Sequence, residues 1–500
     1  MKNQKSNMIE TGAVMIDVGS YTTKIGNCGD ISPKFIIPSC SGIKGKREID
    51  ASKENTTETA KSITSQRDRL QDFVFCHENL TYPHQQMDII WAMENGSIKN
   101  WDVYESLLRY GIYHSHALNF EDLERHPVII SETPWNKGQS RMKQMEILFE
   151  SLGTKMGFIA RASSLAAFSA GRPTGMVLDI GHHSTSISPV VDGFTLTRNV
   201  ERSAIGGEML SKALTKWLEA NDIEIDPFYD RKGGDNTKGK TGTMHSSSSA
   251  TPSSSSASAS SNQPLNQLHD LSQFTKSYLT YQTSSTIEAI KESTISLKPL
   301  PIDPTTLADC EIPYELPDGQ VIDINKGAYL VSETLWNPSC WVSFAEYTMK
   351  SGISGTPDTF GSGAASATPQ TSLSFSPTKL LSSIEEIGLS KSKSVTSTLI
   401  SCFENVDPTI RRELWGNLLV VGGGSCVKGF SERFVQEVDT HAPASVRVKV
   451  IASTILEERK VATWIGGSLL GSLESFTQKW VSKAEYDEVG PSIVEKKCLC

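Results

Sequence analysis

The sequence predicts an α/β fold organised around one structural unit that occurs twice. Val14–Gly26 contains an apolar strand ending in Asp17, a tip with glycine and hydroxyl side chains, and a second β-prone run. Val177–Gly193 repeats this pattern, with Asp179 at the end of the first strand. Elsewhere, apolar runs of strand type alternate with segments of helical periodicity, which is typical of α/β proteins.

Each hairpin tip has the composition of a phosphate-binding turn. Glycine permits positive φ and a close approach of the ligand, so successive backbone N–H groups can point at a phosphate. The aspartate would repel a phosphate, but it can hold a hydrated Mg²⁺ that bridges to the phosphates. A single Asp-x-Gly is equally explained by an ordinary turn between buried strands. Two copies about 160 residues apart favour a pair of hairpins that hold a nucleotide from both sides.

Composition and charge exclude several classes of protein. The net charge of −9, from 48 basic and 57 acidic residues, gives no overall attraction for nucleic acid. The N-terminus lacks the apolar segment of a secretory signal, and no apolar run approaches the roughly 18 residues that a membrane span needs. Nine cysteines without C-x-x-C pairs favour reduced thiols in an intracellular compartment, and no Cys/His cluster has zinc spacing.

Three segments are expected to lie outside the packed core. Residues 41–72 are polar and poor in large apolar side chains, so a mobile excursion is expected there. Eleven of the sixteen residues in Ser246–Ser261 are serine, which predicts a disordered insert over about 230–264. A second disordered, serine-rich insert is expected over about 350–378.

Other helices and strands are predicted from periodicity and turn residues. Helices are expected over 102–110, 141–152, 160–170, 205–218, 268–291, 380–403, 429–438 and 466–480. Strands are expected over 126–130, 418–421 and 446–451, and a hairpin over 314–324. The strand at 418–421 enters a glycine run, where missing side chains would let a planar base approach the backbone.

Several parts of the chain resemble the actin family. Asp17-Val-Gly-Ser20 and Asp179-Ile-Gly181 are similar to the two phosphate hairpins of actin, and Gly422-Gly-Gly-Ser425 is similar to its adenosine loop. Tyr314–Ile322, Trp464–Leu470 and Trp480–Val494 are similar to actin nearly residue for residue. The resemblance covers almost everything outside the inserts and residues 41–72. It implies the actin-like fold, a duplicated ribonuclease H-like fold with two lobes around a nucleotide cleft.

The resemblance also implies the division of the chain and the ligands. The first lobe would span 1–190, the second lobe 191–460, and C-terminal helices over 461–500 would return to the first lobe. ATP and Mg²⁺ are the implied cofactors, with Asp17 and Asp179 holding the metal through water. The implied nucleotide-binding residues are Asp17, Gly19, Ser20, Tyr21, Thr22, Lys24, Asp179, Gly181, His182, Gly422, Gly423, Gly424 and Ser425.

The departures from actin bear on hydrolysis. His182 stands where actin has a further aspartate near the metal, with His183 beside it, while Ser186 and Ala162 replace the histidine and glutamine that arrange the attacking water. Positioning groups contribute roughly 10²–10⁴-fold each. We therefore expect ATP binding with little or no useful hydrolysis, and we assign no catalytic residue. His182 and His183 could equally be solvated at the cleft mouth, because neutral imidazole replaces a carboxylate poorly.

Within the family, the chain is similar to the nuclear actin-related proteins of the fourth class, which include the Brg-associated actin-like subunit of animals. Pro134-Trp-Asn136, the changed second hairpin and the insert positions carry this resemblance. It implies a scaffold subunit of nuclear chromatin-remodelling and histone acetyltransferase complexes, with roles in transcription and DNA repair. Nuclear actin, a helicase-SANT-associated helix of a large subunit, and histones or nucleosomes are the implied partners, and no membrane is expected.

Two other classes remain as alternatives. An ATP-hydrolysing, filament-forming cytoskeletal actin-related protein would share the hairpins, but the segment 41–72 replaces the one through which actins contact the next subunit. A metabolite kinase of the wider superfamily would lack the actin-like C-terminal block. Sedimentation in polymerising salt distinguishes the first alternative.

The partner helix is expected in an apolar groove between the helix ending near Gly171 and the C-terminal helix. The expected groove residues are Phe168, Gly171, Leu469, Leu470, Gly471 and Leu473. Adjacent residues on a helix point about 100° apart, so at least one of Leu469 and Leu470 should face the groove. Gly471 is expected to leave space for the partner. All four apolar side chains could instead belong to the core.

Overall fold

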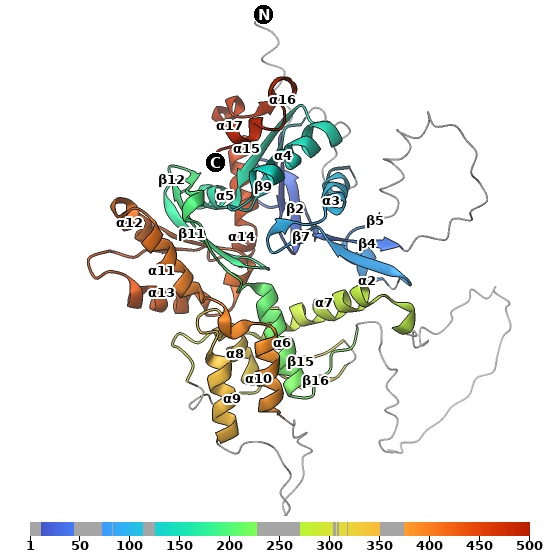
Figure 1. The fold of residues 1–500 in the computed structure, drawn as a ribbon, viewed down its shortest axis with the longest axis vertical. Helices are drawn as coiled ribbons and strands as arrows, with labels where there is room; N and C mark the ends of the chain where they lie inside the picture. Colours follow the sequence, from blue (N-terminus) through green and yellow to red (C-terminus); the bar gives the residue numbers. More distant parts are fainter. Residues whose placement is uncertain are drawn as a thin grey trace, which may run out of the picture.

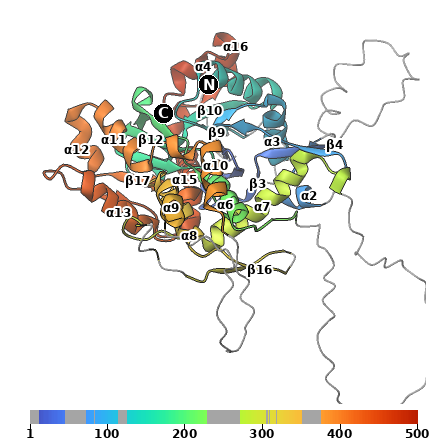
Figure 2. The same ribbon diagram turned by 60° about the horizontal axis from the view of Figure 1, so that its bottom comes forward.

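The structure is a computed structural model that describes residues 12–44, 73–82, 84–113, 126–227, 271–303, 307, 310–317, 319–350 and 375–500. Two sheets form the centres of two lobes, and helices cover their faces (Figures 1 and 2). None of the helices in these ranges is long and apolar enough to cross a membrane. The insert predicted over 230–264 lies outside the described residues.

The first sheet has the strand order β19-β10-β9-β1-β2-β3. Its strands are β1 (Val14–Val18), β2 (Thr22–Asn27), β3 (Phe35–Pro38), β9 (Val128–Glu132), β10 (Met156–Arg161) and β19 (Val481–Ser482). The β1–β2 hairpin is antiparallel, whereas β1, β9 and β10 run parallel to one another. β1 and β9 are buried along their whole length, because helices cover both faces of the sheet.

The second sheet repeats this plan in the order β13-β12-β11-β17-β18, with β14 also paired to β12. Its strands are β11 (Gly175–Ile180), β12 (Thr185–Val191), β13 (Phe194–Thr195), β14 (Glu201–Ser203), β17 (Leu418–Val421) and β18 (Val450–Ile451). The β11–β12 hairpin is antiparallel, while β11, β17 and β18 are parallel. The predicted duplication of a hairpin within an α/β fold is therefore confirmed.

The boundary between the two sheets differs from the expected one. The second hairpin was expected in a first lobe ending at residue 190, but β11 pairs with β17 from residue 176 onward. The change of sheet therefore falls between β10 and β11. The reason is that β11 is an interior strand, so both of its edges need partners, and β17 supplies the second one.

Helices surround both sheets. They are α2 (His77–Thr81), α3 (Trp101–Tyr113), α4 (Gly138–Glu146), α5 (Ala162–Ser169), α6 (Gly207–Ala220), α7 (Lys276–Thr294), α8 (Gly327–Glu333), α9 (Cys340–Lys350), α10 (Pro377–Glu386), α11 (Val395–Asn405), α12 (Pro408–Trp415), α13 (Phe430–His441), α14 (Leu456–Lys460), α15 (Ala462–Ser472), α16 (Lys483–Val489) and α17 (Ile493–Lys497). A small hairpin of β15 (Pro313–Glu315) and β16 (Val321–Asp323) matches the one predicted around residues 314–324.

Several predicted boundaries were wrong. The helix expected over 380–403 is two helices, because Gly388 adopts positive φ (68°) between α10 and α11. The helix expected over 466–480 ends at Ser472, where Leu473 turns extended before a short 3₁₀ helix, Glu474–Gln478. Residues 41–44, expected in a mobile excursion, lie in strand β4 (Cys40–Lys44), and α10 begins at Pro377, inside the predicted second insert.

Helices α5 and α15 lie together between the two sheets. Gly466 of α15 packs so closely on α5 that a Cβ there would overlap the backbone carbonyl of Leu165. On the other side of α15, a Cβ at Gly467 would overlap the side chain of Met15 in β1. Trp464 is fully buried, and its indole N–H donates to the carbonyl of Met15 at 3.0 Å. These contacts fix the α5–α15 pair against the first sheet.

A second junction between the lobes lies at the far end of the cleft. Helix α7 packs on a small sheet formed by β4, β5 (Phe73–Val74) and β6 (Met87–Trp91), as both ribbon views show. Its apolar core comprises Cys40, Leu80, Met87, Ile89, Phe274, Tyr278 and Tyr281. The hydroxyl of Tyr278 donates to the carbonyl of Tyr82 at 2.8 Å. We call this contact between α7 and the β4–β5–β6 sheet the clasp.

Candidate functional site

A cavity of about 610 Å³ lies between the two hairpin tips, and residues of both sheets line it. This volume is in the range of pockets that hold a cofactor. The predicted residues that line it are Asp17, Gly19, Ser20, Tyr21, Thr22, Lys24, Asp179, Gly181, His182, Gly422, Gly423 and Gly424. The structure therefore brings together all but one of the predicted nucleotide-binding residues.

The two hairpin tips have the same turn. The N–H of Gly19 donates to the carbonyl of Thr22 at 3.1 Å, and the N–H of Gly181 donates to the carbonyl of Ser184 at 3.1 Å. A Cβ at Gly19 would lie 2.8 Å from the Thr22 carbonyl oxygen, so this tight turn requires glycine. The repeated sequence pattern thus produces a repeated backbone geometry at the cavity.

The first strand of each hairpin carries one carboxylate near its C-terminal end. Asp17 is buried, accepts a hydrogen bond from the hydroxyl of Ser131 at 2.5 Å and pairs with Lys24 at 3.0 Å. Burial, together with the charge of Asp17, raises the pKa of Asp179 to about 6, although Lys24 acts in the opposite direction. The two carboxylates thus repel each other, and a hydrated divalent cation would relieve this repulsion. The donor set fits Mg²⁺ held through water.

The glycines after β17 have two different roles: some allow close packing, and one faces open space. A Cβ at Gly422 would overlap the carboxylate of Asp179, and one at Gly424 would overlap the side chain of Ile180. Nothing lies within 4 Å of a Cβ at Gly423, which faces open space. Ser425 does not line the cavity, because it is fully buried and its hydroxyl donates to the carbonyl of Gly422 at 2.7 Å. Ser425 therefore shapes the loop, and its contact with a nucleotide stays a prediction.

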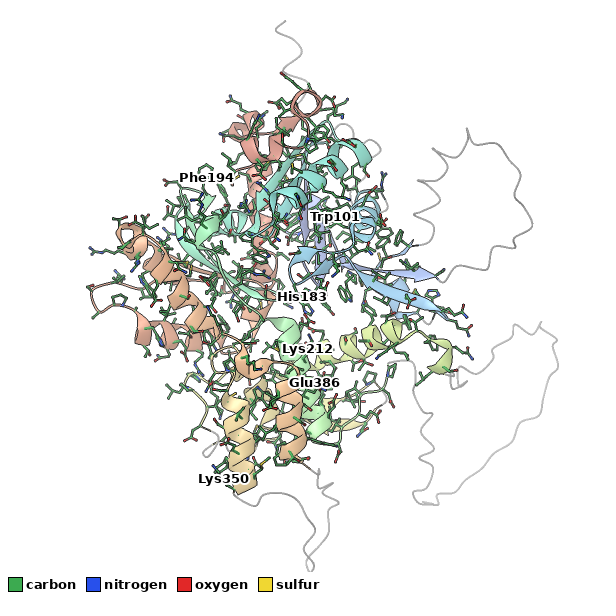
Figure 3. All side chains as sticks on the ribbon, viewed as in Figure 1. Trp101, His183, Phe194, Lys212, Lys350 and Glu386 are labelled. Atoms are coloured by element: carbon green, nitrogen blue, oxygen red, sulfur yellow. The ribbon has the colours of Figure 1, made fainter. Side chains whose placement is uncertain are left out.

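The two histidines of the second tip are engaged with other side chains. The ring of His182 stacks on that of Tyr21, with ring centroids 4.6 Å apart. Burial, and then the charge of Lys291, lowers the pKa of His182 to about 3, so its imidazole is neutral. His183 is hydrogen-bonded through Nδ1 to Glu208. Both rings are partly buried, which weighs against simple solvation at the cleft mouth; Figure 3 places His183 near the centre of the molecule, between the lobes.

Several cavity residues were not predicted from the sequence. Lys291 of α7 donates to the carbonyl of Gly207 at 3.0 Å and to the hydroxyl of Ser211 at 2.7 Å, so it links α7 to the start of α6. Arg459 and Lys460, at the end of α14, also line the cavity. The only feature of the sequence that could have indicated Arg459 and Lys460 as cavity residues is that two adjacent basic residues precede the apolar run of α15. Lys291 had none, because it lies within an ordinary helical pattern.

Ala162 and Ser186, which the resemblance to actin aligns with the residues that arrange the attacking water, both have small side chains. Ala162, at the start of α5, and Ser186, opposite Asp179 in the β11–β12 ladder, both line the cavity. The methyl group of Ala162 cannot form a hydrogen bond to water. Ser186 is 4% exposed, and its short hydroxyl side chain is much smaller than an imidazole.

The expected groove is only partly as predicted. Leu469 and Leu473 are 46% and 47% exposed, whereas Leu470 is 4% exposed and belongs to the core of the first lobe. Gly471 faces inward, because a Cβ there would overlap the thiol of Cys28. The glycine thus serves the packing of α15 and leaves no space for a partner.

The other end of the groove is formed by the end of α5. Phe168 is partly buried against the first core, and Gly171 ends this helix with positive φ (61°) and open space around it. The exposed apolar positions nearby therefore include Leu469 and Leu473, one helical turn apart. Ile31, which is 89% exposed, lies on a loop that is attached to α15 by a hydrogen bond from Ser468 to the carbonyl of Asp30.

Comparison with known proteins identifies the family. The family model described as Actin matches residues 8–499. A protein named Actin-related protein 4 from Oryza sativa subsp. indica is 30% identical over 98% of this chain and 99% of its own length. The Actin-related protein 4 of Schizosaccharomyces pombe is 29% identical over 98% of each chain. Another S. pombe protein, named SWI/SNF and RSC complexes subunit arp42, is 27% identical over 98% of this chain and 100% of its own.

A two-lobed α/β fold with matched hairpins on either side of a cavity defines the actin-like architecture. The chain belongs to the actin family. The resemblance inferred from the hairpins and the C-terminal block is confirmed.

Proposed function

We propose that the protein is a nucleotide-stabilised, non-catalytic scaffold subunit of nuclear chromatin complexes. The observation that carries this proposal is the combination at the cavity: both hairpin tips have the same glycine turn, and the lining includes Ala162 and Ser186, which the resemblance to actin aligns with the residues that arrange the attacking water. ATP with Mg²⁺ is the proposed ligand. Backbone N–H groups of the two tips other than those of Gly19 and Gly181, which are used within the turns, would bind its phosphates. Asp17 and Asp179 would hold the hydrated cation, which would supply positive charge beside the phosphates.

The ligand would stabilise the fold because it contacts both lobes. Lys24 comes from the first hairpin, and Gly423 comes from the second lobe, so one molecule joins both sheets. A ligand that binds only the folded state stabilises it by RT ln(1 + [L]/Kd), which is about 4 kcal/mol at a thousandfold excess over Kd. This stabilisation does not require hydrolysis.

Membership of a chromatin complex is proposed from the relatives. One of them is named as a subunit of the SWI/SNF and RSC complexes, and it matches this chain from end to end. The proposed location is therefore the nucleus. Nuclear actin and a helicase-SANT-associated helix of the large subunit are the proposed direct partners, and histones or nucleosomes are a further proposed contact.

The exposed side chains Ile31, Leu469 and Leu473 are the proposed docking surface for that helix. Leu469 lies in the last turn of α15 and Leu473 is the residue directly after the helix, so the two exposed leucines are four positions apart at its C-terminal end, where an amphipathic helix could pack its apolar residues. Leu470 and Gly471 face the core on the inner side of α15 and do not belong to this surface.

The proposal is tested on full-length protein purified under native conditions. Nucleotide released by denaturation is identified by chromatography, and phosphate release is followed over many hours with Mg²⁺ present. We expect about one bound adenine nucleotide per chain, very slow phosphate release and no sedimentation in polymerising salt. Rapid phosphate release would contradict the non-catalytic role, provided that His183→Ala abolishes it and so shows that it arises at this cavity. Filaments that pellet in the sedimentation assay would favour the cytoskeletal alternative.

A further inference from the structure

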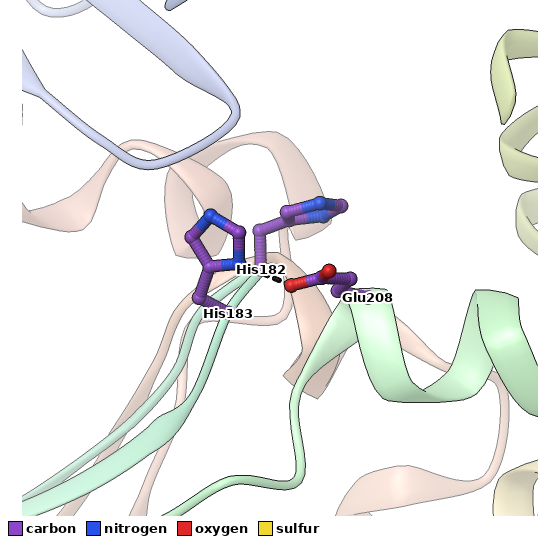
Figure 4. A group of neighbouring side chains, drawn as sticks. All are labelled: His182, His183 and Glu208. Atoms are coloured by element: carbon purple, nitrogen blue, oxygen red, sulfur yellow. Dashed lines mark hydrogen bonds and ion pairs between the residues drawn. The ribbon is translucent and has the colours of Figure 1, made fainter. Parts of the chain in front are cut away.

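Three potential metal ligands meet where the second hairpin touches the start of α6. His182 and His183 form the tip after β11, and Glu208 lies in the first turn of α6 (Figure 4). One ligand atom from each of these residues lies within 4.8 Å of the other two. His183 Nδ1 and a Glu208 carboxylate oxygen are already in contact.

The backbone holds these residues in place. The N–H of Glu208 donates to the carbonyl of His182 at 2.7 Å, and the N–H of Gly207 donates to the carbonyl of Gly181 at 3.0 Å. These two bonds fix the helix start against the hairpin tip. The stacking of His182 on Tyr21 restricts the imidazole ring as well. The three side chains are thus brought together by a rigid frame.

The nearby lysines do not compete for the face on which the ligands meet. Lys212 pairs with one oxygen of Glu208 at 2.8 Å, while the other oxygen contacts His183. This arrangement orients the carboxylate, as outer-shell partners of metal ligands usually do. The three donor positions of Lys291 are used by the carbonyl of Gly207, the hydroxyl of Ser211 and the carboxylate of Glu288.

We propose that His182, His183 and Glu208 bind a first-row divalent metal ion, with Zn²⁺ as the representative probe. Two imidazoles and one carboxylate are a donor set that these ions prefer, and such sites keep a further position for water or a ligand oxygen. Metal–ligand bonds of about 2 Å place donor atoms up to about 4 Å apart. Changes in the side-chain torsions of His183 and Glu208, which are both partly exposed, would close the remaining gap while His182 stays stacked on Tyr21.

The protonation states agree with this geometry. Burial keeps His182 neutral, as described above. Burial would raise the pKa of Glu208, but its hydrogen bonds with His183 and Lys212 outweigh it and lower the pKa to about 2, so the carboxylate is ionised. Because both histidines also line the cavity, the further position of the ion would face its interior.

This site is separate from the water-mediated Mg²⁺ site at Asp17 and Asp179. It is not visible in the sequence, because Glu208 lies 25 residues after His183 and no zinc spacing is present. It also does not depend on the proposed scaffold function, since it can be tested without nucleotide.

The test uses full-length protein stripped of metal and nucleotide by chelation and dialysis. Titration calorimetry with ZnCl₂ alone should give one equivalent of bound Zn²⁺ with a micromolar Kd. His183→Ala and Glu208→Gln should each weaken this binding at least tenfold, while His441→Ala, which removes a histidine on α13, should leave it unchanged. Co²⁺ should give a visible absorption band of a low-coordinate nitrogen-ligated site, and both variants should lose it.

Specific results would overturn the proposal. They are the absence of Zn²⁺ binding by the wild type at submillimolar concentration, or binding by folded His183→Ala that equals the wild type. Circular dichroism melting curves show whether each variant is folded, and His183→Ala provides the answer if Glu208→Gln is unstable. If the wild type binds ATP but not Zn²⁺, the metal site is contradicted and the scaffold function is not. If the wild type binds Zn²⁺ but not ATP, the scaffold function is contradicted and the metal site is not.

Discussion

The ring of Tyr21, at the tip of the first hairpin, stacks on the ring of His182, at the tip of the second, with an interplanar angle of 25°. Tyr21 also stacks on Trp91 of β6, with ring centroids 5.8 Å apart, and the ring centroids of Trp91 and Tyr281 of α7 are 6.3 Å apart. A row of aromatic rings therefore crosses the cleft from one lobe to the other and ends in the clasp.

Weakening the clasp should speed nucleotide release. Tyr278 is fully buried between α7 and the small sheet, so Tyr278→Ala would remove a large part of the clasp core. Opening of the cleft should become easier by more than about 1.4 kcal/mol, which corresponds to release at least tenfold faster. Displacement of a fluorescent ATP analogue in a stopped-flow instrument measures this rate.

Two further variants control the clasp experiment. Tyr278→Phe keeps the ring and removes the hydroxyl with its hydrogen bonds, including the one to Tyr82, and should speed release by less than tenfold. Tyr329→Ala removes a tyrosine that packs on the core of the second lobe, away from the clasp, and should leave the rate unchanged. Equal rates for Tyr278→Ala and wild type would show that the clasp does not limit release.

Neutralising Asp179 should have opposite effects on the empty and the loaded protein. Its pKa is raised to about 6 from an ordinary 3.8, so the carboxylate, which is ionised at pH 7.5, destabilises the folded protein relative to the unfolded chain when no cation is bound. Asp179→Asn should therefore stabilise the nucleotide-free protein by about 1–3 kcal/mol and reduce the additional stabilisation by Mg·ATP. Denaturant unfolding with and without Mg·ATP tests both effects, and Asp487→Asn on exposed α16 should change neither.

Enlarging Gly471 should destabilise the fold. A Cβ there would overlap the thiol of Cys28 and lie 3.0 Å from Ile129. Gly471→Ala should lower the free energy of unfolding by about 1–3 kcal/mol, even though alanine favours helix by about 1 kcal/mol. Gly12→Ala, where nothing lies within 4 Å of the new Cβ, should stay within about 0.5 kcal/mol of wild type. Unchanged stability of Gly471→Ala would show that α15 does not pack as described.

Acid should destabilise the protein partly through His182. The unfolded imidazole takes up a proton near pH 6.5, whereas the folded one has a pKa of about 3, so stability falls as the pH drops from 6.5 toward 3. Between pH 7 and pH 5 this group should account for about 2 kcal/mol. His182→Gln should lose less stability than wild type over this interval, measured by urea unfolding without nucleotide and with a chelator. Parallel losses would show that His182 is protonated equally in both states.

Charge on the exposed face of α15 should block assembly without unfolding the chain. Leu469→Asp and Leu473→Asp place a carboxylate at positions that are nearly half exposed, so the melting temperature should change by only a few degrees. Co-purification with a large-subunit fragment that contains the helicase-SANT-associated helix should fall at least tenfold. Val435→Asp, at an exposed apolar position on α13, is the matched control, and an equal loss there would show that the effect is not specific to α15.

The parts of the fold that the sequence could predict are those set by local patterns. The apolar strand, the aspartate and the glycine-bearing tip of each hairpin predicted two matching turns, and the structure has both. The glycine run was correctly placed at the cavity, but the reason was incomplete. Gly422 and Gly424 are required by Asp179 and Ile180, residues more than two hundred positions earlier in the chain, and only tertiary packing reveals that requirement.

The parts that could not be predicted depend on contacts between distant segments. Periodicity indicated a helix around 268–291, but nothing in it indicated that Tyr278 would pack on a sheet from the first third of the chain. Periodicity also could not tell that Gly471 faces Cys28, because a glycine beside leucines is compatible with either face of α15. The division at residue 190 was wrong for the same reason, since the partner of β11 comes from residue 418 onward.

The close contact of α5 and α15 determines what kind of motion remains. Gly466 rests on the backbone at Leu165, so these helices have no room to slide past each other, although they can still rotate about their crossing point. We therefore expect the cleft to open mainly by rotation about this crossing point. A pair of spectroscopic labels, one on the β4–β5–β6 sheet and one on α7, would report that rotation.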